Sequence, residues 1–489
     1  MPSECILALD VGTSSARAGL YDAQARAVPG MAARRPYSMR TTPDGGVEGD
    51  APFLLGLLGE AIDEVLAKAG PARIAAVATS TFWHSLLGVD PEGAPVTSVF
   101  TWADMRAEPF VDLLRQRMDE KAYHARTGAF FHPLFHPSKY LWLGPTRAAR
   151  WMSFGDWAYE RLFGRFLTTI SMASGTGLLD THACQYDEET LRRVGLRPEQ
   201  LAPLGDTKDF FQGLREPYRS RWPALRDVPW MPPVGDGACN NIGSGCSTRD
   251  RIGLMIGTSG AMRVAFETDR IEIPWGLWCY RADRRRVVLG GALNDGGNLV
   301  EWCRNTLKLG VPEEVERELG AMEPDRHGLT FLPFLAGERS TGWAAHARAA
   351  ITGLHLASTP VEILRAGMEA VALRFAVIYE LMPEAREIVA SGGALLKSHT
   401  WTQILADAIG RPIVPSAEPE SSSRGVALLA LEALGRVQRL EEFPAAVGPA
   451  LEPDRARHMK YVAALARQRD LYDRVIRRGK PGGTGPGSR

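Results

Sequence analysis

Apolar residues gather into short runs at two distant places, and each run leads into a Gly-Thr-Ser turn. The first is "ILALDVGTSSARAGLYD" at residues 6–22, and the second is "IGLMIGTSGAMRVAFE" at residues 252–267. Two apolar runs joined by a short glycine-containing turn predict a β-hairpin. The turn glycines, Gly12 and Gly257, are separated by about half of the chain. The pattern therefore indicates one structural motif that is used twice.

Strand-like and helix-like patterns alternate along the rest of the chain, which favours an α/β fold. Helical spacing of apolar residues predicts helices over 51–70 and across residues 364–378, with Pro383 as a stop signal. Short apolar runs predict strands at 73–80, at the following "LLGV" and at "EIVAS" before the helix "WTQILADAIG". Residues 287–305 read as a strand, a glycine-rich loop and a helix.

A proline-rich stretch at residues 218–237 is the best candidate for a hinge or domain boundary. The expected organisation is an N-terminal lobe over 1–235, a C-terminal lobe over 236–478 and a disordered tail over 479–489. A repeat of half the chain indicates a duplicated domain, because solenoid units are much shorter. A cleft between two such lobes is where we expect a ligand.

Bulk composition excludes several classes of protein. Lysine and arginine (57) balance aspartate and glutamate (57), so no overall charge favours nucleic acid or an anionic membrane. Apolar runs long enough to span a membrane are absent from the sequence, as is a signal peptide. The six cysteines form no CxxC pair, which argues against zinc and favours free thiols in a reducing compartment. We expect a cytoplasmic protein with neither nucleic acid nor membrane as a partner.

The turn Gly12-Thr13-Ser14-Ser15 offers backbone N–H groups and hydroxyls, a combination that suits phosphate oxygens. P-loop and Rossmann motifs are absent. A tight turn without a ligand is the alternative for a single copy, whereas two copies at matching places favour phosphate binding. Arg17 is either a phosphate contact or a solvated strand residue, and its position alone favours neither.

Two aspartates stand out. Asp10 occupies an apolar position, where an isolated carboxylate must be hydrogen-bonded, paired or near a metal. A cap for the turn is disfavoured because the second hairpin has Met255 in its place, so a magnesium-associated carboxylate explains the asymmetry better. Asp236 lies between Gly235 and Gly237; it is suited to accept a proton from an alcohol during phosphoryl transfer, but an ordinary Gly-Asp-Gly turn is the simpler explanation on these residues alone.

Taken together, the motifs resemble the FGGY family of carbohydrate kinases, within the actin/Hsp70/hexokinase-like superfamily. The resemblance covers roughly residues 5–460. It rests on both hairpins and on four further segments in the family's order: "TWADMRA" (101–107), "HPSKYLWL" (136–143), "LPFLAGERSTGW" (332–343) and the region from "SGGALLKSHTW" to "EPESSSRGVALLALEALG". The resemblance implies two ribonuclease H-like (actin-like ATPase) lobes with the active site in the interdomain cleft, and it implies ATP and Mg²⁺.

The resemblance also implies residue roles. Asp236 matches the catalytic base, which also contacts substrate and metal, and Asp10 matches the magnesium-associated carboxylate. Trp83, His84 and Asp104 match substrate-contacting positions. The implied nucleotide-binding residues are Gly12, Thr13, Ser14, Ser15, Arg17, Gly257, Thr258, Gly297 and Gly393.

The implied reaction is ATP-dependent phosphorylation of a small sugar, polyol or sugar acid, with D-gluconate as the first choice and xylulose or another ketopentose or polyol as the alternative. Three departures from the family pattern leave contacts open: Gly237 replaces a usual glutamine, the loop after Gly393 is one residue longer, and alanines follow Arg339 where Asp-Pro-Asn is common. A nucleotide-switched binding protein of the actin/Hsp70 type and a non-catalytic sensor are the alternatives from other classes. The sequence leaves open whether the protein forms a homodimer.

Overall fold

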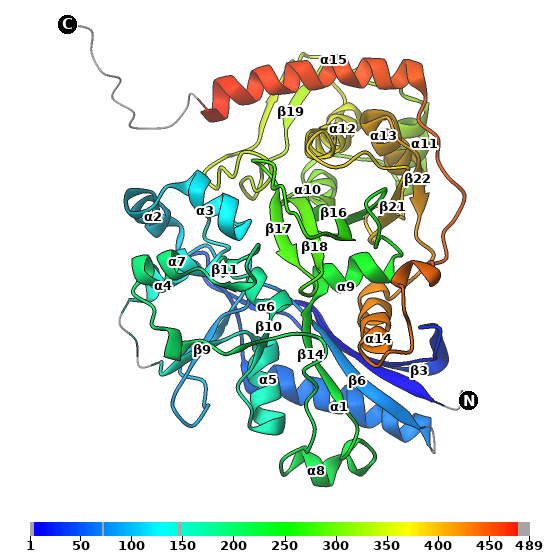
Figure 1. The fold of residues 1–489 in the computed structure, drawn as a ribbon. Coiled ribbons are helices and arrows are strands. Elements are labelled where there is room, and N and C mark those ends of the chain that lie inside the picture. The colour runs from blue at the N-terminus through cyan, green and yellow to red at the C-terminus, as the bar shows by residue number, and fades with distance from the viewer. Residues whose placement is uncertain (1–3, 71–72, 145, 147, 478–489) are drawn as a thin grey trace, which may run out of the picture. The chain divides into compact units, whose positions relative to one another are not determined.

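Both predicted hairpins form in the computed structural model, which describes residues 4–70, 73–144, 146 and 148–477 (Figure 1). β1 (Cys5–Val11) pairs antiparallel with β2 (Ser15–Tyr21), and β15 (Arg251–Ile256) pairs antiparallel with β16 (Gly260–Glu267). In each turn the glycine N–H donates to a serine carbonyl, but over different spans: Gly12 N–H donates to Ser15 O at 3.1 Å, and Gly257 N–H donates to Ser259 O at 2.9 Å. The repeated sequence motif is thus a repeated structural motif.

The chain divides into two compact units that share it in alternating segments. Unit 1 contains residues up to Thr248, Val264–Leu289 and Glu418–Ala446, and unit 2 contains Arg249–Arg263, Gly290–Ala417 and the residues from Val447 onward. The sequence analysis drew one boundary after residue 235, but no single cut separates these units. The tail predicted at 479–489 lies outside the described residues.

Unit 1 is built on a five-stranded sheet in the order β14-β6-β1-β2-β3. Besides the hairpin strands, it contains β3 (Ala27–Pro36), β6 (Ile74–Thr81) and β14 (Trp230–Gly235). β6 lies parallel to both β1 and β14. Helices α1 (Ala51–Ala69) and α5 (Phe154–Phe163) cover one face, and α9 (Asp236–Gly243) and α14 (Ser421–Ala433) cover the other (Figure 1).

Helix α1 shows why the sequence predicted its helices well. Asp50 caps its N-terminus by accepting the N–H of Phe53 at 2.7 Å, and Gly70 ends it with a positive φ. Its apolar residues repeat at helical spacing and are buried against β2 and β3. Local signals and packing agree along this helix, so the prediction for 51–70 is confirmed.

The proline-rich stretch at 218–237 lies within unit 1 and contributes buried residues to its core, so it does not link the two units. Trp222 and Trp230 are both fully buried there, and the stretch ends in β14, an edge strand of the sheet. Pro232 and Pro233 are tolerated because an edge strand need not donate every backbone N–H. The pairing of β14 with β6 is irregular between Met231 and Val234, as expected around two prolines.

Unit 2 contains β15 with its parallel neighbour β21 (Glu387–Ser391), which in turn lies parallel to β22 (Ile413–Pro415). These strands belong to a six-stranded sheet in the order β17-β18-β16-β15-β21-β22, where β17 is Trp278–Arg281 and β18 is Arg286–Leu293. The helices that pack together in this unit are α10 (Gly297–Thr306), α11 (Pro312–Ala321), α12 (Pro360–Tyr379), α13 (His399–Ile409) and α15 (Arg455–Tyr472).

Shorter elements complete the described chain. The remaining helices are α2 (Val111–Arg117), α3 (Glu120–Thr127), α4 (His136–Leu143), α6 (Ile170–Ser174), α7 (Glu188–Val194) and α8 (Tyr218–Arg221). The remaining strands are β4 (Arg40–Thr41), β5 (Val47–Gly49), β7 (Leu87–Val89), β8 (Val99–Phe100), β9 (Arg150–Met152), β10 (Thr168–Thr169), β11 (Leu179–Asp180), β12 (Gln185–Tyr186), β13 (Leu204–Gly205), β19 (Thr330–Leu332) and β20 (Ala350–Thr352).

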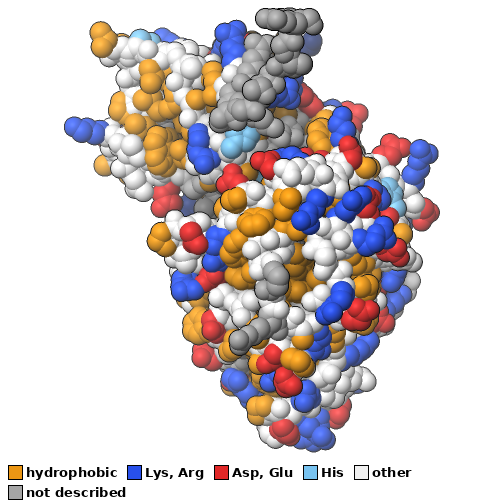
Figure 2. All heavy atoms as spheres, turned by 90° about the vertical axis from the view of Figure 1, so that its left-hand side faces the viewer, with side chains coloured by type: hydrophobic (Ala, Val, Ile, Leu, Met, Phe, Trp, Pro, Cys, Tyr) orange, Lys and Arg blue, Asp and Glu red, His pale blue; other side chains and the backbone are white. Residues whose placement is uncertain are grey.

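The surface matches the neutral composition. Figure 2 shows acidic and basic side chains interspersed over one face, with apolar side chains between them. Among the described helices, none combines the length and the apolar character that crossing a bilayer requires.

Candidate active site

Three parallel strands of unit 1 bring predicted site residues to one edge of the sheet. β1 ends one residue after Asp10, β6 ends just before Trp83 and His84, and β14 ends directly before Asp236. Since β1, β6 and β14 run parallel, their carboxyl ends share an edge, which is where α/β proteins bind ligands. Residues far apart in the sequence are therefore gathered by topology alone.

Asp10 is buried and paired within its own hairpin. Arg17 lies opposite Asp10 in the β1–β2 register, and its Nη1 lies 2.9 Å from Asp10 Oδ2. Burial raises the pKa of Asp10, and the charge of Arg17 acts against that rise. The same Nη1 lies 3.4 Å from Glu420 Oε2, just before α14. Arg17 is thus held between two carboxylates.

Two hydrogen bonds from Tyr37 hold the first Gly-Thr-Ser turn. Tyr37 donates its hydroxyl to Gly12 O and its backbone N–H to Ser14 O at 3.0 Å. Ser15 is buried as the first residue of β2, whereas Ser14 is exposed and Thr13 is partly exposed. The turn accordingly presents Thr13 and Ser14 to solvent on a fixed backbone.

Asp236 is the first residue of α9, where the helix N-terminus favours a negative charge. Its Oδ1 accepts the N–H of Gly237 at 2.8 Å and the N–H of Trp83 at 3.4 Å. Gly237 replaces the glutamine that is usual in the family, and its backbone N–H binds the carboxylate of Asp236. One turn further along, burial strongly raises the pKa of the Cys239 thiol, which keeps that thiol neutral.

Trp83 and His84 sit in an aromatic cluster. The centroid of the Trp83 ring lies 5.0 Å from that of Tyr280, and the His84 ring lies 5.4 Å from Tyr280 and 5.6 Å from Phe135. Trp278 stacks on Tyr280 at 4.3 Å. Trp83 itself is only 4% exposed. The sequence analysis missed Trp278 and Tyr280, although an aromatic pair alternating in the short strand "WCYR" was the available signal.

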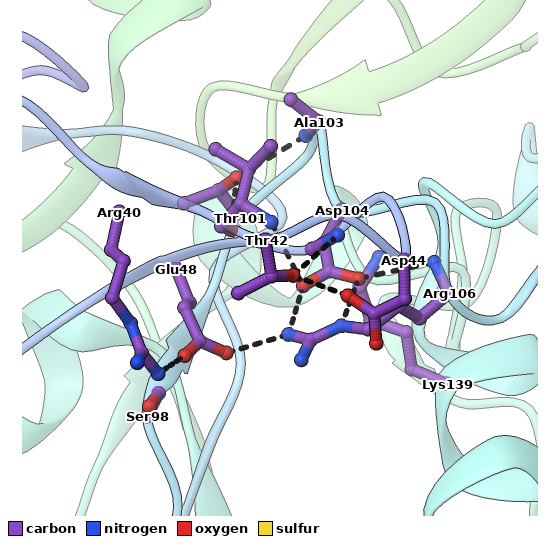
Figure 3. A network of polar contacts seen from close by, with 12 residues as sticks. Arg40, Thr42, Asp44, Glu48, Ser98, Thr101, Ala103, Asp104, Arg106 and Lys139 are labelled. Atoms are coloured by element: carbon purple, nitrogen blue, oxygen red, sulfur yellow. Dashed lines mark hydrogen bonds and ion pairs between the residues drawn. The ribbon is translucent and has the colours of Figure 1, made fainter.

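Asp104 lies at the buried end of a chain of charges (Figure 3). It is fully buried and pairs with Arg106, whose Nη2 also lies 2.6 Å from Glu48 Oε2. Asp104 Oδ2 accepts the N–H of Val47 at 3.3 Å. Glu48 in turn pairs with Arg40, whose side chain is 70% exposed. The carboxylate of Asp104 thereby fixes the β5 region and Arg106.

Lys139, also drawn in Figure 3, is fully buried in α4. Its ammonium donates to Pro133 O and to Leu134 O, the latter at 3.2 Å. Burial lowers the pKa of Lys139 to about 8, although the charge of Asp104 acts in the opposite direction. Its bonds to backbone carbonyls show how Lys139 shapes the 133–134 loop.

The predicted nucleotide residues of unit 2 line one cavity of about 480 Å³. Gly257, Thr258, Gly297 and Gly393 all belong to its wall. Helices α10–α13 supply most of the rest of the lining, including Arg304 and Trp401, and the loop before α13 adds Lys397. The cavity combines apolar side chains, cations and backbone groups, which suits a nucleotide.

Gly297 explains how three loops meet at this cavity. Its N–H donates to Gly257 O at 2.8 Å, and the N–H of Asn298 donates to Thr258 O at 3.1 Å. A Cβ at position 297 would lie 2.5 Å from Gly257 O and 2.6 Å from the Cβ of Ala394. Only glycine permits this approach, so α10 begins directly against the second Gly-Thr-Ser turn.

The loop after Gly393 ends in a capped helix. Ser398 caps α13, and Glu316 of α11 accepts the Ser398 hydroxyl at 3.0 Å and the Thr400 N–H at 3.1 Å. Ser398, Glu316 and Lys397 line the cavity. The start of α13 is therefore fixed beside the cavity by its own cap and by Glu316.

Among the described residues, one group of three side chains has the spacing of metal ligands. Asp325, His327 and Glu369 approach one another closely, but Arg467 pairs with Asp325 and Arg365 pairs with Glu369, which already balances their charge. Asp10 and Asp236 offer two carboxylates at the edge of the first sheet. Magnesium takes one or two carboxylates beside phosphate oxygens, so these two side chains are of a type that fits the metal, although Arg17 already pairs with Asp10.

Comparison with known proteins gives one family over both halves of the chain. The model described as "FGGY family of carbohydrate kinases, N-terminal domain" matches residues 5–243, and that of the C-terminal domain matches residues 254–434. A gluconokinase of Bacillus subtilis (strain 168) is 26% identical over 91% of this chain and 90% of its own length. A glycerol kinase of Citrifermentans bemidjiense is 30% identical over 87% of this chain and 90% of its own.

Two solved structures share the whole fold. The crystal structure of a gluconate kinase from Lactobacillus acidophilus matches with a TM-score of 0.89 and 27% identity, over 97% of this chain and 98% of that one. A ligand-bound xylulose kinase from the same organism matches with a TM-score of 0.90 and 27% identity, over 98% and 100%. The predicted α/β fold of the actin and hexokinase type is confirmed by these matches.

Proposed function

The chain belongs to the FGGY family of carbohydrate kinases, and on that premise we propose that it transfers the γ-phosphoryl group of ATP to a hydroxyl of D-gluconate. The family makes it a phosphotransferase that uses ATP and a sugar-like alcohol. Membership also removes the alternative of a nucleotide-switched chaperone or filament protein. The choice of gluconate rests on the gluconokinases among its relatives.

The observation that carries the proposal is the position of Asp236. It stands at the carboxyl end of β14, with a helix N-terminus and two backbone N–H donors holding its carboxylate. In the proposed reaction this carboxylate accepts the proton of the acceptor hydroxyl while the oxygen bonds to the γ-phosphorus and ADP leaves. A carboxylate held in place by backbone N–H donors suits such a proton transfer.

Other residues take supporting roles in this proposal. Gly12, Thr13, Ser14, Ser15 and Arg17 contact phosphate oxygens of the nucleotide. Asp10 and Asp236 hold magnesium, which when bound neutralises phosphate charge.

The remaining proposed residues divide between nucleotide and acceptor. The cavity wall at Gly257, Thr258, Gly297 and Gly393 receives the nucleotide. His84 contacts the acceptor, while Trp83 and Asp104 shape its surroundings from buried positions.

Xylulose is the second candidate because two observations favour an uncharged acceptor. A xylulose kinase shares the fold as closely as the gluconate kinase does. In addition, Arg106, the cation nearest to Asp104 in the charge network, is already paired with Asp104 and Glu48. Binding the carboxylate of gluconate there would require Arg106 to leave one of these partners.

The compartment proposed for the protein is the cytoplasm. All six cysteines lie in the described part of the chain, are buried and form no disulfide there, which fits a reducing environment.

The test is an acceptor panel in an assay of ADP release. Gluconate, xylulose, glycerol and related polyols and sugar acids would each be supplied with ATP and magnesium. We expect the highest kcat/KM with gluconate. A higher value with xylulose would replace gluconate by the second candidate, and no stimulation by any acceptor would contradict the proposed reaction.

A further inference from the structure

β14, which ends directly before Asp236, is paired only irregularly within its sheet. β14 lies at the sheet edge, contains Pro232 and Pro233, and loses its regular pairing with β6 between Met231 and Val234. Prolines donate no backbone hydrogen bond. Something other than the sheet must therefore define where this strand ends and where the carboxylate at its end lies.

Buried hydroxyls provide that anchoring at alternate residues of β14. Tyr159 donates its hydroxyl to Met231 O at 2.7 Å, and Thr169 donates its hydroxyl to Pro233 O at 2.7 Å. At the end of the strand, Ser171 Oγ accepts the N–H of Gly235 at 3.1 Å. The last of these bonds is adjacent to Asp236 in the chain.

Trp83, which follows β6 in the chain, binds both Ser171 and Asp236. Its indole Nε1 donates to Ser171 O at 2.9 Å, and its backbone N–H donates to Asp236 Oδ1 at 3.4 Å. The indole ring lies close to Gly235 and Gly175: a Cβ at position 235 would lie 2.0 Å from the ring, and one at position 175 would lie 2.7 Å from it. Each position must be glycine for Trp83 to fit.

We propose that Ser171 and Trp83 are positioning residues for Asp236. Ser171 binds Gly235 through its side chain and the Trp83 indole through its backbone carbonyl, and Trp83 then reaches the carboxylate through its own N–H. Ser171 is fully buried, so its part in the reaction is played through Asp236. This inference rests on the proposed role of Asp236 as the base.

The test compares Ser171→Ala and Trp83→Phe with matched controls. Ser153→Ala also removes a buried serine Oγ that accepts a backbone N–H, here that of Asp156 at 3.1 Å. Trp157→Phe also removes a buried indole N–H that donates to a carbonyl, here Gly93 O at 3.0 Å. Neither control residue contacts Asp236 or β14 through these bonds. Circular dichroism and the thermal midpoint verify that each variant is folded.

We expect kcat to fall about 10- to 100-fold in Ser171→Ala and Trp83→Phe, because a displacement of about 1 Å at a reacting group can cost about 10²-fold. The KM for ATP should stay at the wild-type value. Ser153→Ala and Trp157→Phe should change none of these.

A second arm separates this inference from the proposed function. In an Asp236→Asn background, adding Ser171→Ala should cause no further loss of turnover, because its effect passes through the carboxylate. If Ser171→Ala and Trp83→Phe match their controls while Asp236→Asn abolishes turnover, the positioning role is overturned and the base stands. If Asp236→Asn retains wild-type turnover, the base assignment itself fails. Should one of the two variants not fold, the other carries the test.

Discussion

Arg17 and Asp10 face each other across the first hairpin, with Arg17 Nη1 2.9 Å from Asp10 Oδ2. The side chain of Asp10 is 4% exposed, and Arg17 also lies 3.4 Å from Glu420. This pair allows a carboxylate to occupy an apolar position of β1, which the second hairpin fills with Met255. The asymmetry noted in the sequence thus has a physical cause in the structure.

Arg17→Met should destabilise the protein by about 1–3 kcal/mol, because Asp10 would remain buried without its cationic partner. Adding Asp10→Asn should restore most of that loss, since the amide carries no charge. Denaturant unfolding of both variants measures the difference. Arg26→Met is the control: it breaks an exposed pair with Asp22, where less than about 1 kcal/mol is expected. An equal loss in Arg26→Met, or no recovery in the double variant, would contradict this account.

In the charge network of Figure 3, the contribution of each arginine to the free energy of unfolding should fall from the buried end to the exposed end. Arg106→Met leaves Asp104 and Glu48 buried without Arg106, which should cost about 3–5 kcal/mol. Arg40→Met removes a side chain that is 70% exposed, which should cost less than about 1 kcal/mol. Unfolding free energies give the ranking. The KM for the acceptor should rise in Arg106→Met alone; a reversed ranking would refute the role given to burial.

Stability should depend on pH through Lys139. Burial lowers its pKa to about 8, against an ordinary value of 10.5, so between these values the unfolded chain binds more protons than the folded one. Unfolding free energy of the wild type relative to Lys139→Met should therefore be constant below pH 8. It should then rise with pH by about 3 kcal/mol in total up to pH 10.5.

Denaturation curves between pH 7 and 10 measure this difference. Lys68→Met, which removes a lysine on the exposed side of α1, serves as the control and should show no such rise. A wild-type advantage over Lys139→Met that falls above pH 8 would mean that the buried ammonium is stabilised by its surroundings.

Gly297→Ala should weaken ATP binding by displacing the second Gly-Thr-Ser turn. Its methyl group would lie 2.5 Å from Gly257 O and 2.6 Å from Ala394 Cβ, so one of the three loops must move. Gly393→Ala is matched to it, because no atom lies within 4 Å of a Cβ at that position. Calorimetric titration with ATP should show a larger loss of affinity for Gly297→Ala. Equal affinities in the two variants would argue against the close approach.

Helices and strands that carry their own sequence signals, such as a cap, a turn or a regular apolar spacing, could be predicted. The two hairpins, α1 with its Asp50 cap and the strand-to-helix segment ending in α10 all appear where the patterns place them. β3 was not predicted because its residues are mostly exposed, so they show no regular alternation of apolar and polar positions. Its strand form comes from pairing with β2 and from packing against α1.

Longer-range features of the site could not be predicted from the pattern of residues. Trp83 matched a substrate position, but its burial follows from Gly175 and Gly235, which are distant from it in the sequence. Asp104 matched another, and its link to Glu48 through Arg106 depends on strands that were not predicted. Glu418–Ala446 likewise belongs to unit 1 through tertiary packing, which the local spacing of apolar residues does not reveal.

The most direct measurement is acceptor-dependent ADP formation by Asp236→Asn, with ATP affinity determined in parallel. Asp50→Asn is the control, since asparagine caps a helix as well as aspartate does. The account predicts that turnover of Asp236→Asn falls by about 10²–10⁴-fold or more while ATP affinity and the activity of Asp50→Asn are retained. Wild-type turnover by Asp236→Asn would contradict the account.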